Sequence, residues 1–166
     1  MKKTLLILLS LAACGRGDAP PDNRAMADSR SAATDSKAAR ADAPAGVRLA
    51  GLYEGGAGAQ KNQLCIVETG KAAQFGLIVW GSNLHSCSGA GQAVRDGDRL
   101  TLKMAGDEAC AIEASLKGGT VALPAKVPEG CAYYCGARAT LAGARFTRSG
   151  DNVRKATDIA GDPLCD

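Results

Sequence analysis

Residues 99–104 read Arg-Leu-Thr-Leu-Lys-Met, and this stretch decides the fold class. Its apolar side chains, Leu100, Leu102 and Met104, occupy every second position and alternate with polar ones. Side chains of a β-strand point alternately to opposite faces of the sheet, so this pattern predicts a strand with one buried face and one solvated face.

Similar runs lie on both sides of this stretch and are separated by turn residues rich in glycine. The predicted strands span 49–54, 63–68, 74–80, 85–95, 99–104, 110–116 and 121–123. Residues 75–80 are apolar on both parities, which is typical of a strand covered on both faces. Strands at intervals of about ten residues predict a mainly β domain, either a small antiparallel barrel or a sandwich.

A short helix is predicted at the C-terminus. Ser149 or Asp151 is placed to cap it, and Gly161 with Pro163 would end it. The residues expected along its apolar side are Val153, Ala156 and Ile159 or Ala160.

The cysteines predict a framework of disulfides. Apart from Cys14, the chain contains Cys65, Cys87, Cys110, Cys131, Cys135 and Cys165. An even number of cysteines in an exported protein predicts up to three bridges. Six cysteines allow 15 pairings, among which the sequence does not choose.

The first residues have the order of an export signal. Lys2 and Lys3 precede a short apolar run, which ends in Leu11-Ala12-Ala13-Cys14. This motif resembles the lipobox of bacterial lipoproteins. The resemblance implies cleavage before Cys14, acylation of that cysteine, and a membrane anchor for a domain facing the periplasm. Gly15 follows the cysteine, which favours the outer membrane.

Three segments are therefore expected: a signal peptide (1–13), a lipidated tether (14–46) and a folded domain (47–166). Residues 15–46 contain no aromatic residue and no Leu, Ile, Val or Phe, so they cannot bury enough apolar surface to fold. The domain carries 13 Lys and Arg against 12 Asp and Glu. This balance argues against a nucleic-acid partner.

His85 and Cys87 are the first candidate pair for chemistry, since a nucleophile pair or a metal site uses such residues. Either use needs a reduced Cys87, whereas the even cysteine count predicts a bridge. His85 is the only histidine in the chain, and no other metal-ligand or cofactor motif is present. The sequence predicts no catalytic residue, no metal and no cofactor.

Tyr133 and Tyr134 lie between Cys131 and Cys135, which are separated by three residues. Thioredoxin-like dithiols have two intervening residues, so we expect the two cysteines to bridge to different partners. The tyrosines are then held on a stiff loop. They serve there either as contact residues or as a plug for the end of a barrel, and the sequence leaves both readings open.

Residues 88–91 read Ser-Gly-Ala-Gly, a run that suits an anion-binding loop, a strand bend or a bulge. The run also resembles the Ser-Gly-rich loop of the membrane-anchored inhibitors of animal-type lysozyme. That family consists of small disulfide-stapled β-barrels, many of them lipoproteins. The resemblance implies Ser88 as a contact residue and, more weakly, Arg95 as a basic contact.

These observations predict a membrane-anchored envelope lipoprotein whose domain binds a partner or has a structural role and is not an enzyme. The expected partner is the membrane, through lipid on Cys14, together with an envelope protein or a lysozyme-like protein. Two alternatives remain: a lysozyme-inhibitor-like protein, and a hydrolase of envelope components. A hydrolase would need a base and a nucleophile in one cleft, which for this chain means Asp and Glu.

Overall fold

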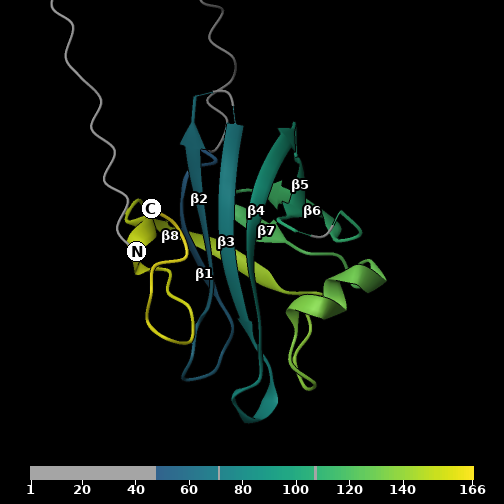
Figure 1. The fold of residues 1–166 in the computed structure, drawn as a ribbon. Coiled ribbons are helices and arrows are strands. Elements are labelled where there is room, and N and C mark those ends of the chain that lie inside the picture. Colours follow the sequence, from purple (N-terminus) through teal and green to yellow (C-terminus); the bar gives the residue numbers. More distant parts are fainter. Residues whose placement is uncertain (1–47, 71, 107) are drawn as a thin grey trace, which may run out of the picture. The chain divides into compact units, whose positions relative to one another are not determined.

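The computed structural model describes residues 48–70, 72–106 and 108–166. In these residues eight antiparallel strands form a closed barrel, in which each strand pairs with its sequence neighbours and β8 pairs with β1 (Figure 1). The mainly β, antiparallel fold is therefore confirmed, and of the two predicted architectures the barrel is correct. The strands are β1 (Gly51–Gly55), β2 (Asn62–Thr69), β3 (Ala72–Trp80), β4 (Ser86–Asp96), β5 (Arg99–Met104), β6 (Ala111–Lys117), β7 (Thr120–Ala122) and β8 (Arg145–Gly150).

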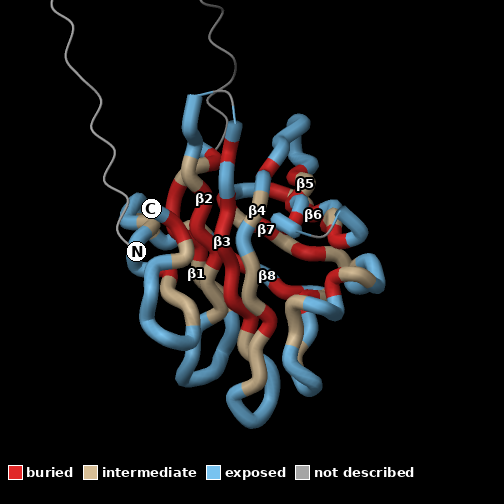
Figure 2. The backbone as a smooth tube through the Cα atoms, viewed as in Figure 1, coloured by how far each residue is buried: buried red, intermediate tan, exposed pale blue. Residues whose placement is uncertain are grey.

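The alternation in β5 places its side chains as predicted. Leu100 and Leu102 are fully buried, whereas Arg99 and Lys103 on the other parity are exposed. The buried cluster draws side chains from all eight strands and therefore fills the barrel interior. Figure 2 shows the buried residues gathered in the strands and the exposed ones in the turns.

Strand β3 is covered on both faces, as its apolar sequence predicts. Phe75 and Leu77 belong to the barrel core, and Gly76 and Ile78 on the other parity are buried as well. The C-terminal segment lies against this outer face. The main-chain oxygen of Leu164 occupies the space that a Cβ at position 76 would need, so only glycine fits beneath it.

The prediction of a C-terminal helix is wrong. The segment contains only one short 3-10 turn, η3 (Val153–Lys155). The reason is that the side chain of Gln63 takes the main-chain groups that a helix would use. Its Nε2 donates to the oxygen of Lys155 at 3.1 Å, and its Oε1 accepts from the nitrogen of Thr157 at 3.1 Å.

A small apolar cluster joins the C-terminal segment to the outside of the barrel. The disulfide Cys65–Cys165 lies in this cluster, together with the buried side chains of Leu52 and Ala156. The bridge joins residues 100 positions apart. It attaches the end of the chain to β2.

Strand β8 has no counterpart among the predicted strands, yet it closes the barrel by pairing with both β7 and β1. Phe146 is fully buried, but Arg148 lies opposite the buried Tyr53, at a position where an apolar residue is expected. Its Nη2 donates to the main-chain oxygen of Ala50 at 3.1 Å and also pairs with the carboxylate of Asp151. The arginine interrupts the apolar alternation that would otherwise mark the strand.

Tyr53 makes the stability of the barrel depend on pH in the alkaline range. Its hydroxyl donates to the main-chain oxygen of Leu49 at 2.6 Å. Burial raises the pKa of the Tyr53 phenol, and the positive charges of Arg148 and Arg95 oppose this shift. The folded protein thus keeps a proton that the unfolded chain loses above about pH 10, so higher pH favours unfolding.

We therefore expect the free energy of unfolding to fall as the pH rises above about 10. Tyr53→Phe lacks the hydrogen bond, so it should be less stable by about 1 kcal/mol at neutral pH. It also lacks the ionisable group, so the difference from the wild type should narrow at high pH. Urea denaturation of both proteins between neutral pH and pH 11 measures the difference, and a constant difference would contradict this role of Tyr53.

Candidate functional site

The connection from β7 to β8 contains the 3-10 turn η2 (Glu129–Tyr134) and packs against the barrel core. Two disulfides hold this turn, Cys110–Cys131 and Cys87–Cys135. The prediction that Cys131 and Cys135 bridge to different partners is therefore confirmed. With Cys65–Cys165, all six cysteines of the described residues are paired, as predicted.

Tyr133 and Tyr134 end this turn in different surroundings. Tyr133 is 83% exposed, whereas Tyr134 is half-buried and packs against the core. The hydroxyl of Tyr134 donates to the main-chain oxygen of Ala105 at 2.8 Å. The two rings meet edge to face, with their centroids 5.3 Å apart. The two tyrosines therefore differ: Tyr134 packs on the barrel, as the plug reading expects, and Tyr133 presents its ring to solvent, as the contact reading expects.

Of the readings left open for residues 88–91, the anion-binding loop is wrong, because the run lies inside β4, within the predicted strand 85–95, and pairs along its length with β3. Glycine is needed here for close packing. A Cβ at position 89 would stand 2.9 Å from Sδ of Met104 and 3.0 Å from Cδ1 of Tyr134. Gly89 therefore lets the Tyr134 ring lie directly against β4. Alternation along the strand directs the Ser88 side chain to the opposite face.

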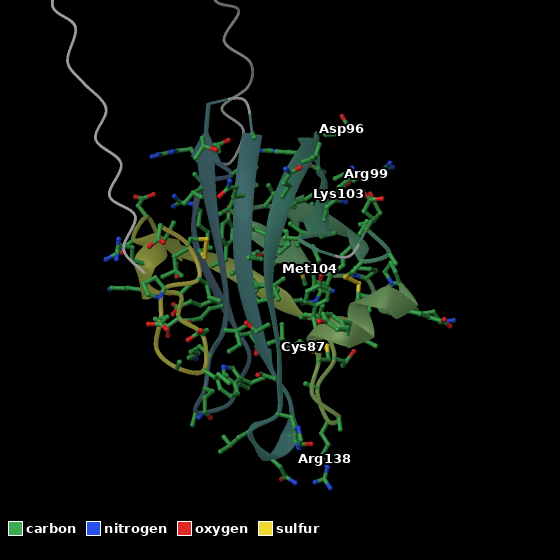
Figure 3. All side chains as sticks on the ribbon, viewed as in Figure 1. Cys87, Asp96, Arg99, Lys103, Met104 and Arg138 are labelled. Carbon is green, nitrogen blue, oxygen red and sulfur yellow. A yellow bond between two sulfur atoms is a disulfide. The ribbon has the colours of Figure 1, made fainter. Side chains whose placement is uncertain are left out.

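The structure thus brings the two candidate segments together through their backbones. The bridge Cys87–Cys135 joins β4 to the end of η2, and the nitrogen of Gly136 donates to the oxygen of Ser86 at 2.8 Å. In Figure 3, Cys87 and Met104 lie on the side of the barrel that η2 covers. The tyrosine pair is consequently supported by the barrel itself and does not project on a long loop.

A surface hollow of about 600 Å³ is lined in part by Ala105, whose main-chain oxygen accepts the hydrogen bond from Tyr134. Gln92 and Lys103 line it and are direct partners across β4 and β5. Glu108 contributes a carboxylate beyond the end of β5. These polar residues are not among the predicted site residues. The alternation of β5 does place Lys103 on the solvent face, but no sequence signal links it to the tyrosines.

We use the name tyrosine surface for Tyr133 and Tyr134 with the turn η2 that carries them. It offers one exposed aromatic ring on a support that two disulfides hold against the barrel.

Cys87 and His85, the residues considered for thiol or metal chemistry, both take part in the packing of the folded protein. Cys87 is in a disulfide and is therefore not a thiol nucleophile in this state. A Cβ at Gly136 would stand 3.0 Å from Nδ1 of His85, so the imidazole packs against that backbone. Among the described residues, no group of three His, Cys, Asp or Glu side chains is placed to hold a metal ion.

Arg95 lies away from the tyrosine surface. It stands near the end of β4, where its Nε donates to the main-chain oxygen of Gly97 in the following turn at 2.9 Å. Ser88 is seven residues earlier on the same strand, a separation of about 23 Å at the usual rise of a strand. The structure does not bring these two predicted contacts together.

No protein-family model matches this chain, and no curated protein or solved structure shows significant similarity to it. The fold and the site must therefore be interpreted from their own residues.

The predicted signal peptide (1–13), lipidated Cys14 and tether (14–46) lie outside the described residues. Within residues 48–70, 72–106 and 108–166, no helix is long and apolar enough to cross a membrane.

Proposed function

We propose that this protein is a membrane-anchored module of the bacterial envelope that binds an envelope component through the tyrosine surface without catalysing a reaction. The observation that carries the proposal is the placement of Tyr133. Its ring is 83% exposed, yet it stands on a turn that two disulfides hold against a closed barrel. An exposed aromatic ring on a rigid support is typical of a contact residue.

The three disulfides support a location outside the cytoplasm. Such bridges persist in oxidising compartments and are rare in the cytosol. The lipobox-like motif ending in Cys14 gives the anchor of this proposal, since acyl chains on that cysteine would hold the domain at the membrane surface.

Rigidity supports binding as the role of this surface. A flexible loop loses conformational freedom when it binds, and this loss weakens the complex. In η2 the disulfides impose this restriction before binding, and the hydrogen bond from Tyr134 to Ala105 fixes the base of the aromatic pair. Tyr133 therefore offers contact area at a small entropic cost.

The capture of envelope material by the full chain tests the proposal. The protein, purified from membranes in detergent and immobilised, should retain a component of an envelope extract. Tyr133→Ala should reduce the retained amount at least about fivefold, because truncation of an anchoring aromatic residue commonly costs more than 1 kcal/mol. Tyr134 is left intact in this variant because it packs on the core.

Ile159→Ala is the matched control, because Ile159 is also large, apolar and exposed, at 73%, but lies on the C-terminal segment. This variant should retain as much material as the wild type. Equal retention by Tyr133→Ala and the wild type would exclude Tyr133 as the contact. Circular dichroism spectra of the variants check that the barrel is intact.

The lysozyme-inhibitor-like role remains the alternative, favoured by the architecture. The closed barrel with three disulfides is the fold that this resemblance implies. The position of Ser88 inside β4 departs from the loop on which the resemblance rests. This alternative predicts that the protein slows lysis in a lysozyme assay, and unchanged lysis at high molar excess would remove it.

A further inference from the structure

We propose that this protein is a substrate of a disulfide isomerase of the envelope, because its three bridges are nested along the chain. The inference goes beyond the proposed function and takes from it only that the chain is exported. The isomerase converts bridges that form between neighbouring cysteines during export into the bridges of the folded barrel.

The three bridges enclose one another along the sequence. They join residues 21, 48 and 100 positions apart, in the pairs Cys110–Cys131, Cys87–Cys135 and Cys65–Cys165. Only the innermost pair consists of two cysteines that follow each other in the sequence. Pairing in the order in which the cysteines leave a membrane would give that same bridge together with two wrong ones, Cys65–Cys87 and Cys135–Cys165.

Loop closure in the unfolded chain favours the wrong partner of Cys65. Cys87 is 22 residues away from it, whereas its partner in the folded protein is 100 residues away. The entropic cost of closing a loop rises with the logarithm of its length, which favours the shorter loop by about tenfold. The barrel closes only after β8 has emerged, because β8 pairs with β1. Cys65 and Cys87 therefore meet before the fold can separate them.

The barrel wall separates the two cysteines of each wrong bridge. Cys65 and Cys165 lie in the apolar cluster outside the wall, whereas Cys87 lies in the barrel core and Cys135 packs against that core. In addition, β3 lies between β2, which carries Cys65, and β4, which carries Cys87. Two strand spacings are about 10 Å, and a disulfide spans at most about 7 Å between Cα atoms. The wrong bridges must therefore be broken before the barrel forms.

Thiol–disulfide exchange converts the two wrong bridges into two correct ones without net oxidation. A thiolate of the isomerase attacks the sulfur of Cys65, forms a mixed disulfide with it and releases Cys87 as a thiolate. Cys87 then attacks the sulfur of Cys135, which forms the bridge Cys87–Cys135 and releases Cys165. Cys165 attacks Cys65 in the mixed disulfide, which forms the last bridge and returns the thiolate of the isomerase.

Burial gives this exchange its direction. Cys65 and Cys87 are completely buried in the barrel, and Cys165 is nearly so. A thiolate must reach a sulfur atom to attack it, so the bridges of the folded protein are protected from the isomerase. The wrong bridges, which do not permit the barrel, stay accessible.

Export of the full chain in two strains of a Gram-negative host, with and without the periplasmic disulfide isomerase, tests the inference. Free thiols are blocked, and the bridges are mapped by mass spectrometry of unreduced peptides. Without the isomerase, the share of chains with Cys65–Cys165 should fall by about tenfold, with Cys65–Cys87 in its place. Addition of the reduced isomerase to the extracted protein should restore Cys65–Cys165.

The matched control keeps only the bridge between consecutive cysteines, Cys110–Cys131. It replaces the other four cysteines of the domain: Cys65→Ala, Cys87→Ala, Cys135→Ala and Cys165→Ala. The remaining bridge has no competing partner, so it should form equally in both strains whether or not the variant folds.

Equal shares of Cys65–Cys165 in both strains would overturn the inference. The proposed function would be unaffected by that result, because the capture assay with Tyr133→Ala tests it separately. A chain that stays in the cytoplasm with reduced cysteines would overturn both.

Discussion

Replacing Cys65 and Cys165 together by alanine is expected to lower the free energy of unfolding by about 4 kcal/mol. This bridge joins residues 100 positions apart, so its loss restores the most freedom to the unfolded chain. It also releases the C-terminal segment from the outer face of β2 and β3. Guanidinium denaturation of the oxidised proteins measures the loss.

The Cys110→Ala and Cys131→Ala double variant is the matched comparison. Its bridge also lies in a buried environment, but it joins residues only 21 positions apart. The chain-entropy model gives a smaller loss for this variant, by about 1.4 kcal/mol. An equal or larger loss would show that the contribution of Cys65–Cys165 does not come from the length of the closed loop.

Phe146→Ala is expected to destabilise the protein by about 3–5 kcal/mol, the usual cost of removing a buried phenylalanine. Phe146 is fully buried on β8, the strand that closes the barrel between β7 and β1. Thermal and urea denaturation measure the effect.

Thr147→Ala is the control for this prediction, because Thr147 is exposed on the same strand and contacts Thr120 only at the surface. It should change the free energy of unfolding by less than about 1 kcal/mol. Similar losses from both variants would indicate that β8 does not depend on its inward side chain.

The strands that the sequence predicts are those whose buried side chains are apolar without interruption. β5 is the clearest case, because Leu100, Leu102 and Met104 all point into the barrel. The sequence pattern does not indicate β8, because Arg148 takes an inward position on this strand. There the guanidinium finds the oxygen of Ala50 and the carboxylate of Asp151, partners that depend on the folded chain.

The prediction of a C-terminal helix is wrong for a similar reason. Val153 and Ala156 do face the barrel, as the helical pattern suggests, whereas Ile159 and Ala160, also expected on that side, are exposed. The hydrogen bonds that would extend the helix are replaced by bonds to Gln63, a residue over 90 positions away. A local helical pattern does not predict that a distant side chain competes for the backbone.

The site was only partly predictable. The sequence indicates that Tyr133 and Tyr134 are held by cysteines, but the disulfide partners decide which ring packs and which is exposed. Ser88 stands out through its glycine neighbours, but Gly89 leaves space for the Tyr134 ring and Gly91 for the main-chain oxygen of Lys103. The pairing of Lys103 with Gln92 arises from cross-strand register, which no short motif records.

Hydrogen exchange of the full chain, with and without the envelope material that it captures, tests the central claim most directly. Slower exchange on binding should be confined to peptides from η2, which carries the tyrosine surface, and from the parts of β4 and β5 against which Tyr134 packs. Peptides from the C-terminal segment and from the turn between β4 and β5 should exchange at unchanged rates. Protection of those peptides, with none at η2, would contradict the assignment of the tyrosine surface as the binding site.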